Sequence, residues 1–242
     1  MDTKTVVNAL WLYDDLLDLY GDWGNLLVLK SYFGKMNIEF NIIKKSIGDD
    51  FDLEVADFVY IGPGKFKNLC AASRDILRYK DDIKTAIESG KCFLVTGNAR
   101  LMFGNSFEDT GKNLYEGLGI FDYTGHESGN VKISDVVAFP VYSETPIKSY
   151  GFINRTSYIE GNRGDYMFNV IKGFGDVDAV CESEGNIYRN FFSTWLLGPL
   201  LAKNPHLAIE LMKRILQAEA IEVDTSLADK ALELTLLDKN LQ

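Results

Sequence analysis

The stretch Phe93–Gly104, FLVTGNARLMFG, has the pattern of a buried strand that turns directly into a helix. A turn of this kind exposes one side chain, and α/β hydrolytic enzymes place a nucleophile there. It also directs backbone N–H groups and a helix N-terminus toward whatever binds at the turn. The residue expected at the exposed position is Thr96, followed by Gly97 and Asn98. Thr96 is therefore a candidate nucleophile, with a substituted nucleophile and an ordinary turn residue as the alternatives.

Three further stretches have patterns that a binding or catalytic site could use. Leu19–Asn25, LYGDWGN, follows the first expected strand. A tight turn, Gly62-Pro63-Gly64, ends another apolar run and is followed by Lys65. The third stretch, Ser193–Pro205, reads STWLLGPLLAKNP and comes late in the chain.

The elements that position these residues alternate between strand and helix in the first half of the chain. This succession predicts a parallel sheet covered by helices on both faces. Strands are expected at Val6–Tyr13, Ile38–Lys44, Ala56–Ile61 and Phe93–Val95, and helices at Asn25–Met36 and Lys67–Ser89.

From about Gly117 the pattern changes to short β-prone segments that indicate hairpins, with Glu184-Gly185 as one turn. Helices return at Pro205–Ala220 and over 226–240. No repeat, low-complexity tract or linker divides the chain. Residues 1–242 are expected to form one domain with a C-terminal helix over 226–242. The β-prone segments are Val131–Phe139, Ser149–Asn154, Tyr166–Phe174, Ala179–Ser183 and Asn186–Phe192.

Composition limits the classes of protein that fit. A chain of 242 residues with 46% hydrophobic composition can bury one large core. The net charge of −10, with the basic residues spread along the chain, argues against a nucleic-acid partner. Three cysteines without C-x-x-C spacing indicate thiols in a reducing compartment. Two histidines argue against a metal site, and no cofactor is expected.

The sequence has no stretch of about 20 continuous apolar residues. The short N-terminal apolar run is interrupted by acids, and no cleavage-site pattern follows it. We therefore expect a cytoplasmic protein that does not contact a membrane.

Taken together, the four stretches resemble motifs of class I glutamine amidotransferases of the cobyric acid synthase (CobB/CobQ) type. The nearest branch is the glutaminase subunit of bacterial lipid II isoglutaminyl synthase. That branch has LYGDRGN after the first strand, a Gly-Gly-Gly turn, a Cys-Gly-Gly elbow and a late T-Y-L-H-G-P-L-L-x-K-N-P segment. Here Gly151–Asn154 is also similar to its G-F-E-N stretch, and the motifs occur in order up to about Ile215. The resemblance implies a three-layer α/β sandwich with a mostly parallel central sheet and extra β-hairpins in the second half.

In that family an elbow cysteine attacks the side-chain amide of glutamine, a histidine acts as base and acid, and the glycine turn stabilises the oxyanion. By this resemblance the nucleophile position holds Thr96 and the histidine position holds Leu197. The oxyanion turn becomes Gly62-Pro63-Gly64, and proline has no N–H to donate. The combination predicts that the glutaminase chemistry is lost.

Polar residues nevertheless remain around the expected site and could hold a small anion or a carboxylate. The alternative is that they are ordinary solvated residues. His126 falls where related subunits have an arginine that holds the substrate carboxylate. The candidate ligand-binding residues are Lys65, Gly97, Asn98, Arg100, His126, Asn154 and Arg155.

The resemblance predicts an inactive homologue that serves as a structural or regulatory subunit of a Mur-ligase-like, ATP-dependent synthetase. The chain has no Gly-Lys-Ser/Thr phosphate loop of its own, so the synthetase would be a separate protein. Two alternatives stay open: an active amidotransferase with a non-standard site, and a sensor of a small glutamine-like molecule. The pathway, cell wall or cobalamin, also stays open.

Overall fold

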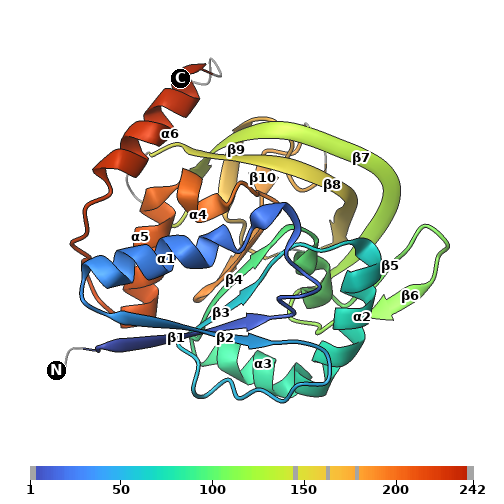
Figure 1. Cartoon of the computed structure of the whole chain (residues 1–242). Coiled ribbons are helices and arrows are strands. Elements are labelled where there is room, and N and C mark those ends of the chain that lie inside the picture. Colours follow the sequence, from blue (N-terminus) through green and yellow to red (C-terminus); the bar gives the residue numbers. More distant parts are fainter. Residues whose placement is uncertain (1–3, 144–146, 162–163, 178–179, 239–242) are drawn as a thin grey trace.

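A computed structural model describes residues 4–143, 147–161, 164–177 and 180–238 of the chain (Figure 1). Its centre is a six-stranded sheet in the order β11-β12-β4-β3-β1-β2. All neighbours pair in parallel except β11, which is antiparallel to β12, so the predicted parallel sheet is confirmed. The strands are β1 (Val6–Leu12), β2 (Glu39–Lys45), β3 (Phe58–Ile61), β4 (Cys92–Thr96), β11 (Asn186–Tyr188) and β12 (Phe191–Thr194).

Strands β3, β4 and β12 are buried along their whole length, as expected for a parallel sheet covered on both faces. Their register brings the three carboxyl ends to the same edge: Ile61 pairs with Val95, and Thr96 pairs with Thr194. The motifs that follow these strands are therefore neighbours in space although they are far apart in sequence.

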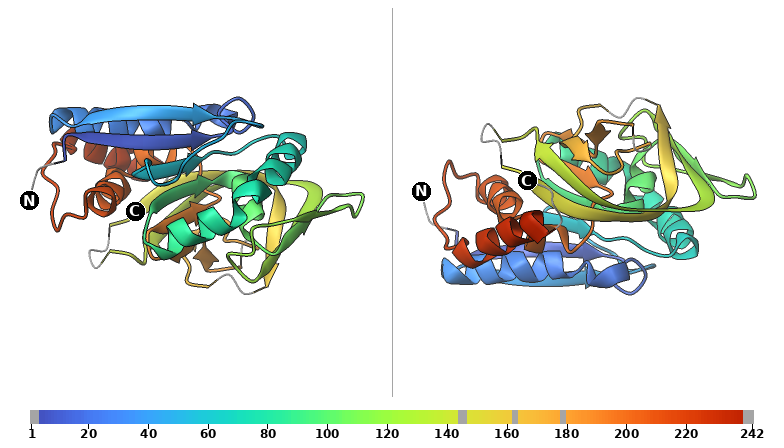
Figure 2. Two further views of the ribbon diagram at one scale, coloured as in Figure 1. Left: turned by 90° about the horizontal axis from the view of Figure 1, so that it is seen from below. Right: turned by 90° about the horizontal axis from the view of Figure 1, so that it is seen from above.

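Helices α1 (Gly24–Lys35) and α5 (Pro205–Leu216) cover one face of the central sheet, and α3 (Lys80–Glu88) covers the other (Figure 2). The single helix expected over Lys67–Ser89 is divided into α2 (Phe66–Ile76), a 3-10 turn at Leu77–Tyr79, and α3. The chain leaves the α-helical conformation at Tyr79, where φ is −112° and ψ is 16°. The side chains of Arg78 and Tyr79 there hydrogen-bond to Asp49 and Asp50 in the loop after β2.

The second half forms a second sheet, ordered β10-β9-β7-β5-β6, with β8 paired to β7. The predicted hairpin character is confirmed, but two of the expected short strands are parts of longer ones. β7 is continuous for 18 residues. Its pairing register with β8 shifts between Glu127 and Lys132, where the sequence contains Ser128, Gly129 and Asn130. Ala179, the expected start of one strand, lies outside the described residues. The bounds are β5 (Ser106–Glu108), β6 (Leu114–Glu116), β7 (Tyr123–Pro140), β8 (Ser149–Gly161), β9 (Phe168–Lys172) and β10 (Ser183–Glu184).

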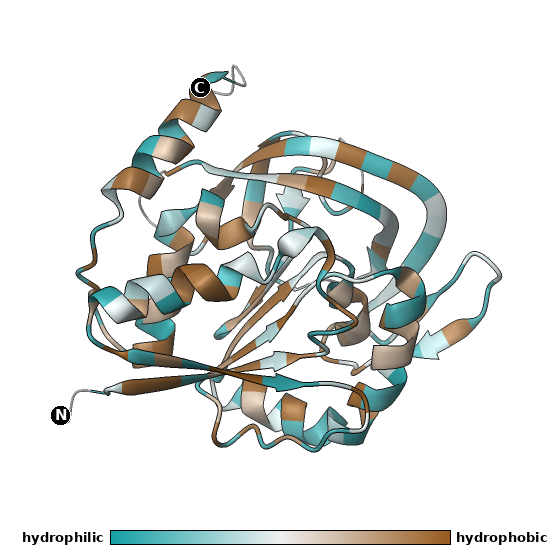
Figure 3. Ribbon diagram, viewed as in Figure 1, coloured by the Kyte–Doolittle hydropathy of each residue, from teal (hydrophilic) through white to brown (hydrophobic). Residues whose placement is uncertain are grey.

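One continuous cluster of buried apolar side chains includes members of both sheets, among them Leu94, Phe103 and Phe168. Figure 3 shows hydrophobic stretches along the central strands and polar residues on the outer surface of the helices. The chain ends with α4 (Leu200–Lys203), α5 and α6 (Ser226–Asp238). The remainder of the expected C-terminal helix, 239–242, lies outside the described residues. In the part of the chain that is described, no helix is both long and apolar enough to cross a bilayer.

Candidate functional site

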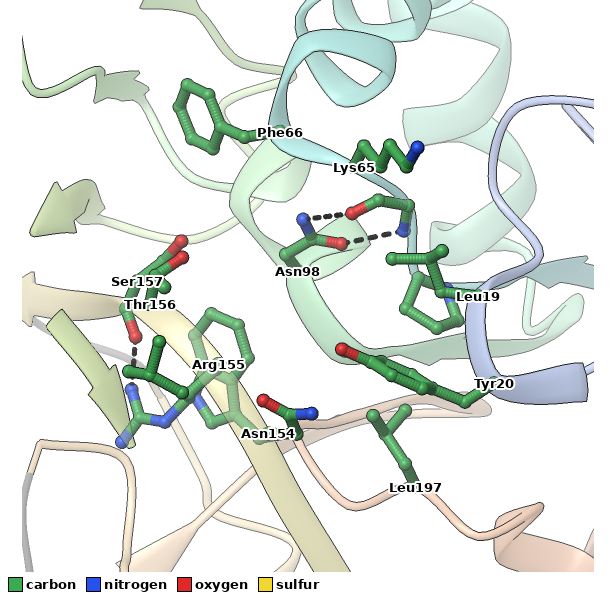
Figure 4. Close-up of a pocket in the computed structure, with 15 residues that line it drawn as sticks. Leu19, Tyr20, Lys65, Phe66, Asn98, Asn154, Arg155, Thr156, Ser157 and Leu197 are labelled. Atoms are coloured by element: carbon green, nitrogen blue, oxygen red, sulfur yellow. Dashed lines mark hydrogen bonds between the residues drawn. The ribbon is translucent and has the colours of Figure 1, made fainter. Parts of the chain in front are cut away.

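A cavity of about 260 Å³ opens where the central strands end at their carboxyl edge (Figure 4). The loops that follow β1, β3, β4 and β12 all contribute to its wall, and β7 and β8 of the second sheet complete it. This is the position at which open α/β sheets bind their ligands. The four stretches singled out in the sequence therefore converge on one site.

The turn after β4 is made by Gly97 rather than by Thr96. Gly97 has a φ of +59°, in the left-handed region, whereas Thr96 has extended backbone with φ −116° and ψ 152°. The Thr96 side chain has no exposed surface, and its hydroxyl donates a hydrogen bond to Asp22 in the interior. The expectation that Thr96 presents its side chain at the turn is wrong, because the sharp turn comes one residue later.

Gly97 lies between two other residues of the expected catalytic site. A Cβ atom on Gly97 would be 2.6 Å from the Cβ atom of Pro63 and 3.5 Å from Cδ2 of Leu197. These residues follow β4, β3 and β12 respectively. Gly97, Pro63 and Leu197 therefore lie side by side, and none of the three has an ionisable side chain.

Asp22, in the loop after β1, anchors the inner side of this turn. Its Oδ2 accepts hydrogen bonds from Thr96 and from the Tyr60 hydroxyl, the latter at 2.7 Å, while Oδ1 has no hydrogen-bond partner. Burial raises the pKa of Asp22 to about 6. Asn25 closes the loop, since its amide donates to the main-chain oxygen of Asp22 and its Oδ1 accepts from Leu201 N. The polar residues of LYGDWGN thus hold the loops together.

Arg100 is wholly buried and does not face the cavity, which contradicts its expected ligand-binding role. Its guanidinium donates to Asp176 at 2.6 Å and to Asn186 at 2.6 Å, with Glu184 at 3.4 Å. The segment that carries it, Gly97–Phe103, is the helix expected after the turn, in the 3-10 form.

Glu184 connects this buried cluster to the end of β12 and to the residue that follows it. It accepts hydrogen bonds from the Thr194 hydroxyl at 2.7 Å and from Trp195 N at 2.6 Å. Burial, together with the neighbouring Asp176 carboxylate, raises the pKa of Glu184 to about 7. The cluster therefore fixes the segment after β12, which supplies Trp195 and Leu197 to the cavity wall.

Asn98 lines the cavity, but both groups of its side chain are engaged by Gly64. Its Oδ1 accepts from Gly64 N at 2.9 Å, and its Nδ2 donates to Gly64 O at 2.7 Å (Figure 4). This clamp joins the turn after β3 to the turn after β4. The next residue, Lys65, is exposed, lines the cavity and stands at the N-cap of α2.

Asn154 and Arg155 contribute from β8. Arg155 is only 6% exposed and donates to the main-chain oxygens of Ser157, at 2.6 Å, and Gly175, at 2.8 Å. Burial lowers its pKa to about 10, so the guanidinium stays charged at neutral pH. It lies over the ring of Trp195, 4.7 Å from the ring centre.

Four of the expected site residues lie outside the cavity wall. Thr96 and Arg100 point into the interior, and a Cβ on Gly62 would meet the backbone of Leu17 at 2.7 Å. His126 is on β7, where its Nδ1 is 2.9 Å from Oε1 of Glu108. The expected residues that do line the cavity are Pro63, Gly64, Lys65, Gly97, Asn98, Asn154, Arg155 and Leu197.

No cysteine or histidine occurs among the described residues that line the cavity. Cys92 is buried in β4, and burial raises the pKa of its thiol. His206 hydrogen-bonds through Nε2 to the Ser149 hydroxyl at 2.8 Å, away from the cavity. Within the described ranges, His, Cys, Asp and Glu form no group of three or more that could hold a metal ion.

Tyr20 belongs to the LYGDWGN stretch, but the sequence did not single it out as a residue of the cavity wall. Its φ is +65°, unusual for a bulky residue, and the side chain is 51% exposed beside the cavity. Its ring meets the ring of Phe152 edge-on, with the centres 6.2 Å apart. The position of Tyr20 directly before Gly21 in the loop after β1 was a possible signal, but sequence alone does not specify a positive φ.

Comparison with known proteins gives relatives along most of the chain. The GatD subunit of lipid II isoglutaminyl synthase (glutamine-hydrolyzing) from Staphylococcus aureus is 28% identical over 223 residues, covering 91% of this chain and 88% of that protein. The Streptococcus pneumoniae subunit of the same name is 30% identical over 217 residues, covering 87% and 81%. No protein-family model matches.

Solved structures share the fold at much lower identity. A glutamine amidotransferase superposes with a TM-score of 0.50 at 14% identity, covering 87% of this chain and 98% of that one. The glutaminase domain of Trypanosoma brucei CTPS, with bound acivicin, gives 0.50 at 9% identity, covering 90% and 98%. These likenesses agree with the layered α/β arrangement of the chain.

Proposed function

The chain belongs to the family of the GatD subunit of lipid II isoglutaminyl synthase, and we propose that it is a member that no longer hydrolyses glutamine. It would keep the amidotransferase fold and the cavity at the carboxyl edge of the sheet. It would not release ammonia from glutamine.

The observation that supports this proposal is the identity of the residue at the turn after β4. Covalent hydrolysis of an amide needs a nucleophile on the enzyme and a base within hydrogen-bond reach of it. Gly97 has no side chain, Leu197 has no proton to exchange, and Pro63 has no N–H for an oxyanion. Loss of a nucleophile or base from such a site costs factors of about 10⁴ to 10⁶ in rate.

Thr96 is a poor substitute for the missing nucleophile. Its hydroxyl is buried and committed to Asp22, and it is not among the residues that line the cavity. A substrate would reach it only if Gly97 and its neighbours moved. An active amidotransferase that uses Thr96 is therefore not favoured.

We also propose that the chain acts as a structural or regulatory subunit of a Mur-ligase-like, ATP-dependent synthetase. Both curated relatives are named as subunits of a synthase, and the chain covers 88% and 81% of their lengths. The test is co-purification with the synthetase encoded in the same cell, using a tagged chain at native expression. Recovery of the chain without any ligase-like protein would contradict this role.

Release of ammonia from glutamine tests the loss of hydrolysis. The purified chain should release none above the rate in buffer, alone or with the synthetase added. Turnover that disappears on Thr96→Ala would instead establish a threonine-dependent amidotransferase. Turnover that survives Thr96→Ala would place the nucleophile elsewhere.

A second candidate function, sensing of a small molecule, is favoured by the persistence of the cavity itself. Its volume is about 260 Å³, and charged side chains remain in its wall after the reactive ones are gone. A sensor would be stabilised by its ligand without turning it over.

A further inference from the structure

We infer that two copies of the chain associate through the free edge of β2, with the two β2 strands antiparallel about a twofold axis that passes through Ile42. The partner is thus a second copy of this chain, and the pairing joins two central sheets into one. The surface is separate from the cavity, because no residue of β2 lines it. This pairing does not depend on the proposed loss of hydrolysis.

β2 is the outermost strand at one end of the central sheet. It is seven residues long, and β1 is the only strand that pairs with it in the described part of the chain. Figure 2 (left) shows β2 at the margin of the molecule, with no strand beyond it. The opposite end of the sheet is β11, which has only three residues. β2 therefore presents the longer free edge of this sheet.

The pairing with β1 shows which backbone groups of β2 lie at the free edge. Glu39 N donates to Thr5 O at 2.8 Å, and the main-chain oxygen of Lys45 accepts from Tyr13 N at 2.5 Å. In a parallel pair the N–H and C=O groups of one residue face the same neighbour, and the next residue faces the other side. The odd-numbered residues of β2 therefore bond to β1, and the even-numbered residues direct their N–H and C=O groups to the free edge.

Phe40, Ile42 and Lys44 are thus the residues whose backbone is available for pairing. Within the described residues, their outward N–H and C=O groups have no hydrogen-bond partner. Such a row of free groups is a template for another strand. A twofold axis perpendicular to the sheet places Ile42 opposite Ile42 of the second copy, and Phe40 opposite Lys44 of the second copy. Each free group then finds a partner in an antiparallel ladder.

The charged ends of β2 select this register. Glu39 is exposed, Lys45 is half-buried at the other end, and neither makes an ion pair within the described residues. With the axis at Ile42, Glu39 of each copy lies opposite Lys45 of the other, so opposite charges meet at both ends of the ladder. Registers centred on Asn41 or Ile43 also pair the free backbone groups, but they separate these charges and pair fewer residues.

Lysines on an edge strand often discourage association, and Lys44 is the residue that could do so here. Its Nζ pairs with Asp14 at 3.0 Å and lies 4.8 Å from the centre of a Trp11 ring. The charge of Lys44 is therefore balanced within its own copy, and it lies opposite a phenylalanine instead of another cation. Ile42 and Ile43 are only half-buried, so a second copy would remove more of their apolar surface from water.

Sedimentation velocity of the full chain at roughly 1–200 μM tests the inference. Two seven-residue strands make a small contact, so we expect a reversible dimer that dissociates on dilution. Glu39→Lys and Lys45→Glu should each weaken dimerisation about tenfold, because each places like charges opposite one another at both ends. The double variant Glu39→Lys/Lys45→Glu restores opposite charges and should recover the affinity of the unmodified chain.

Glu160→Lys is the matched control, because it changes the net charge equally at an exposed position of β8 in the second sheet. It should leave the dimer unchanged, and far-UV circular dichroism checks that every variant is folded. A chain that stays monomeric across the whole concentration range overturns the inference. So do single variants that dimerise as tightly as the unmodified chain, a double variant as weak as the single ones, or a control that weakens the dimer as much as Glu39→Lys.

Discussion

The Cβ atom that Gly97 lacks would lie 2.6 Å from the Cβ atom of Pro63, closer than two such atoms approach in proteins. The left-handed backbone of Gly97 independently favours glycine. Two features therefore disfavour any side chain at position 97: the left-handed backbone conformation and the close approach of Pro63. Because these two residues follow β4 and β3, the two turns pack directly against each other at the edge of the sheet where the cavity opens.

The first prediction concerns the free energy of unfolding of Gly97→Ala. This variant should lose about 1–3 kcal/mol, from the positive φ and from the contact with Pro63. Gly21→Ala is the control, since Gly21 has a similar φ of +66° but nothing within 4 Å of an added Cβ. Denaturant unfolding should show a smaller loss for the control.

A double-mutant cycle separates the two causes. Pro63→Gly should recover the excess loss of Gly97→Ala and none of the loss of Gly21→Ala. Zero coupling between residues 63 and 97 would show that the two do not exclude each other's side chains.

The second prediction concerns Asp22 and pH. Its pKa in the folded protein is about 6, above the ordinary value of 3.8, because the carboxyl group is buried. The folded state therefore holds an extra proton between these values, and this group's contribution to stability falls as pH rises from about 4 to 6 and is constant above. Asp22→Asn removes the dependence, so its stability relative to the unmodified protein should improve by up to about 3 kcal/mol between pH 4 and 7.

Denaturant unfolding at pH 4, 5, 6 and 7 measures this difference. Asp82→Asn, at an exposed position of α3, controls for the removal of one acid from a chain of net charge −10. A relative stability of Asp22→Asn that does not change with pH would be inconsistent with a buried carboxyl group at this position.

The third prediction concerns the buried cluster of Arg100. Arg100→Leu should destabilise the chain by about 3–5 kcal/mol, because Asp176 and Glu184 would remain buried without their cation. Lys230→Leu removes an exposed ion pair with Glu233 on α6 and should cost about 0–1 kcal/mol. Equal losses for the two variants, measured by denaturant unfolding, would contradict the structural role of the cluster.

The sheet and the location of the site could be predicted from the sequence, because both depend on local patterns and on chain order. Apolar runs such as Phe93–Val95 mark buried strands, and the turn at Gly62–Gly64 marks a strand end. The order of the motifs then brings these ends together at one edge. The rules for connecting parallel strands through helices allow few other topologies for a chain with this order of strands and helices.

The role of individual side chains could not be predicted, because it depends on distant partners. Thr96 and Gly97 are both plausible turn residues, and the choice between them is made by Asp22, which is 74 residues away from Thr96. Arg100 is drawn inward by Asp176 and Glu184, which are 76 and 84 residues away. Sequence spacing alone carries no signal of either contact.

Ammonia release from glutamine by two engineered variants, beside the unmodified chain, tests the central claim most directly. Pro63→Gly/Gly97→Cys/Leu197→His places a thiol and an imidazole at the turn and removes the blocking proline, whereas Thr96→Cys/Leu197→His puts the thiol at the buried neighbour. We predict no release by the unmodified chain or by the double variant, and measurable release by the triple variant. Release by the unmodified chain, or by the double variant and not the triple, would contradict the assignment of Gly97 as the vacant nucleophile position.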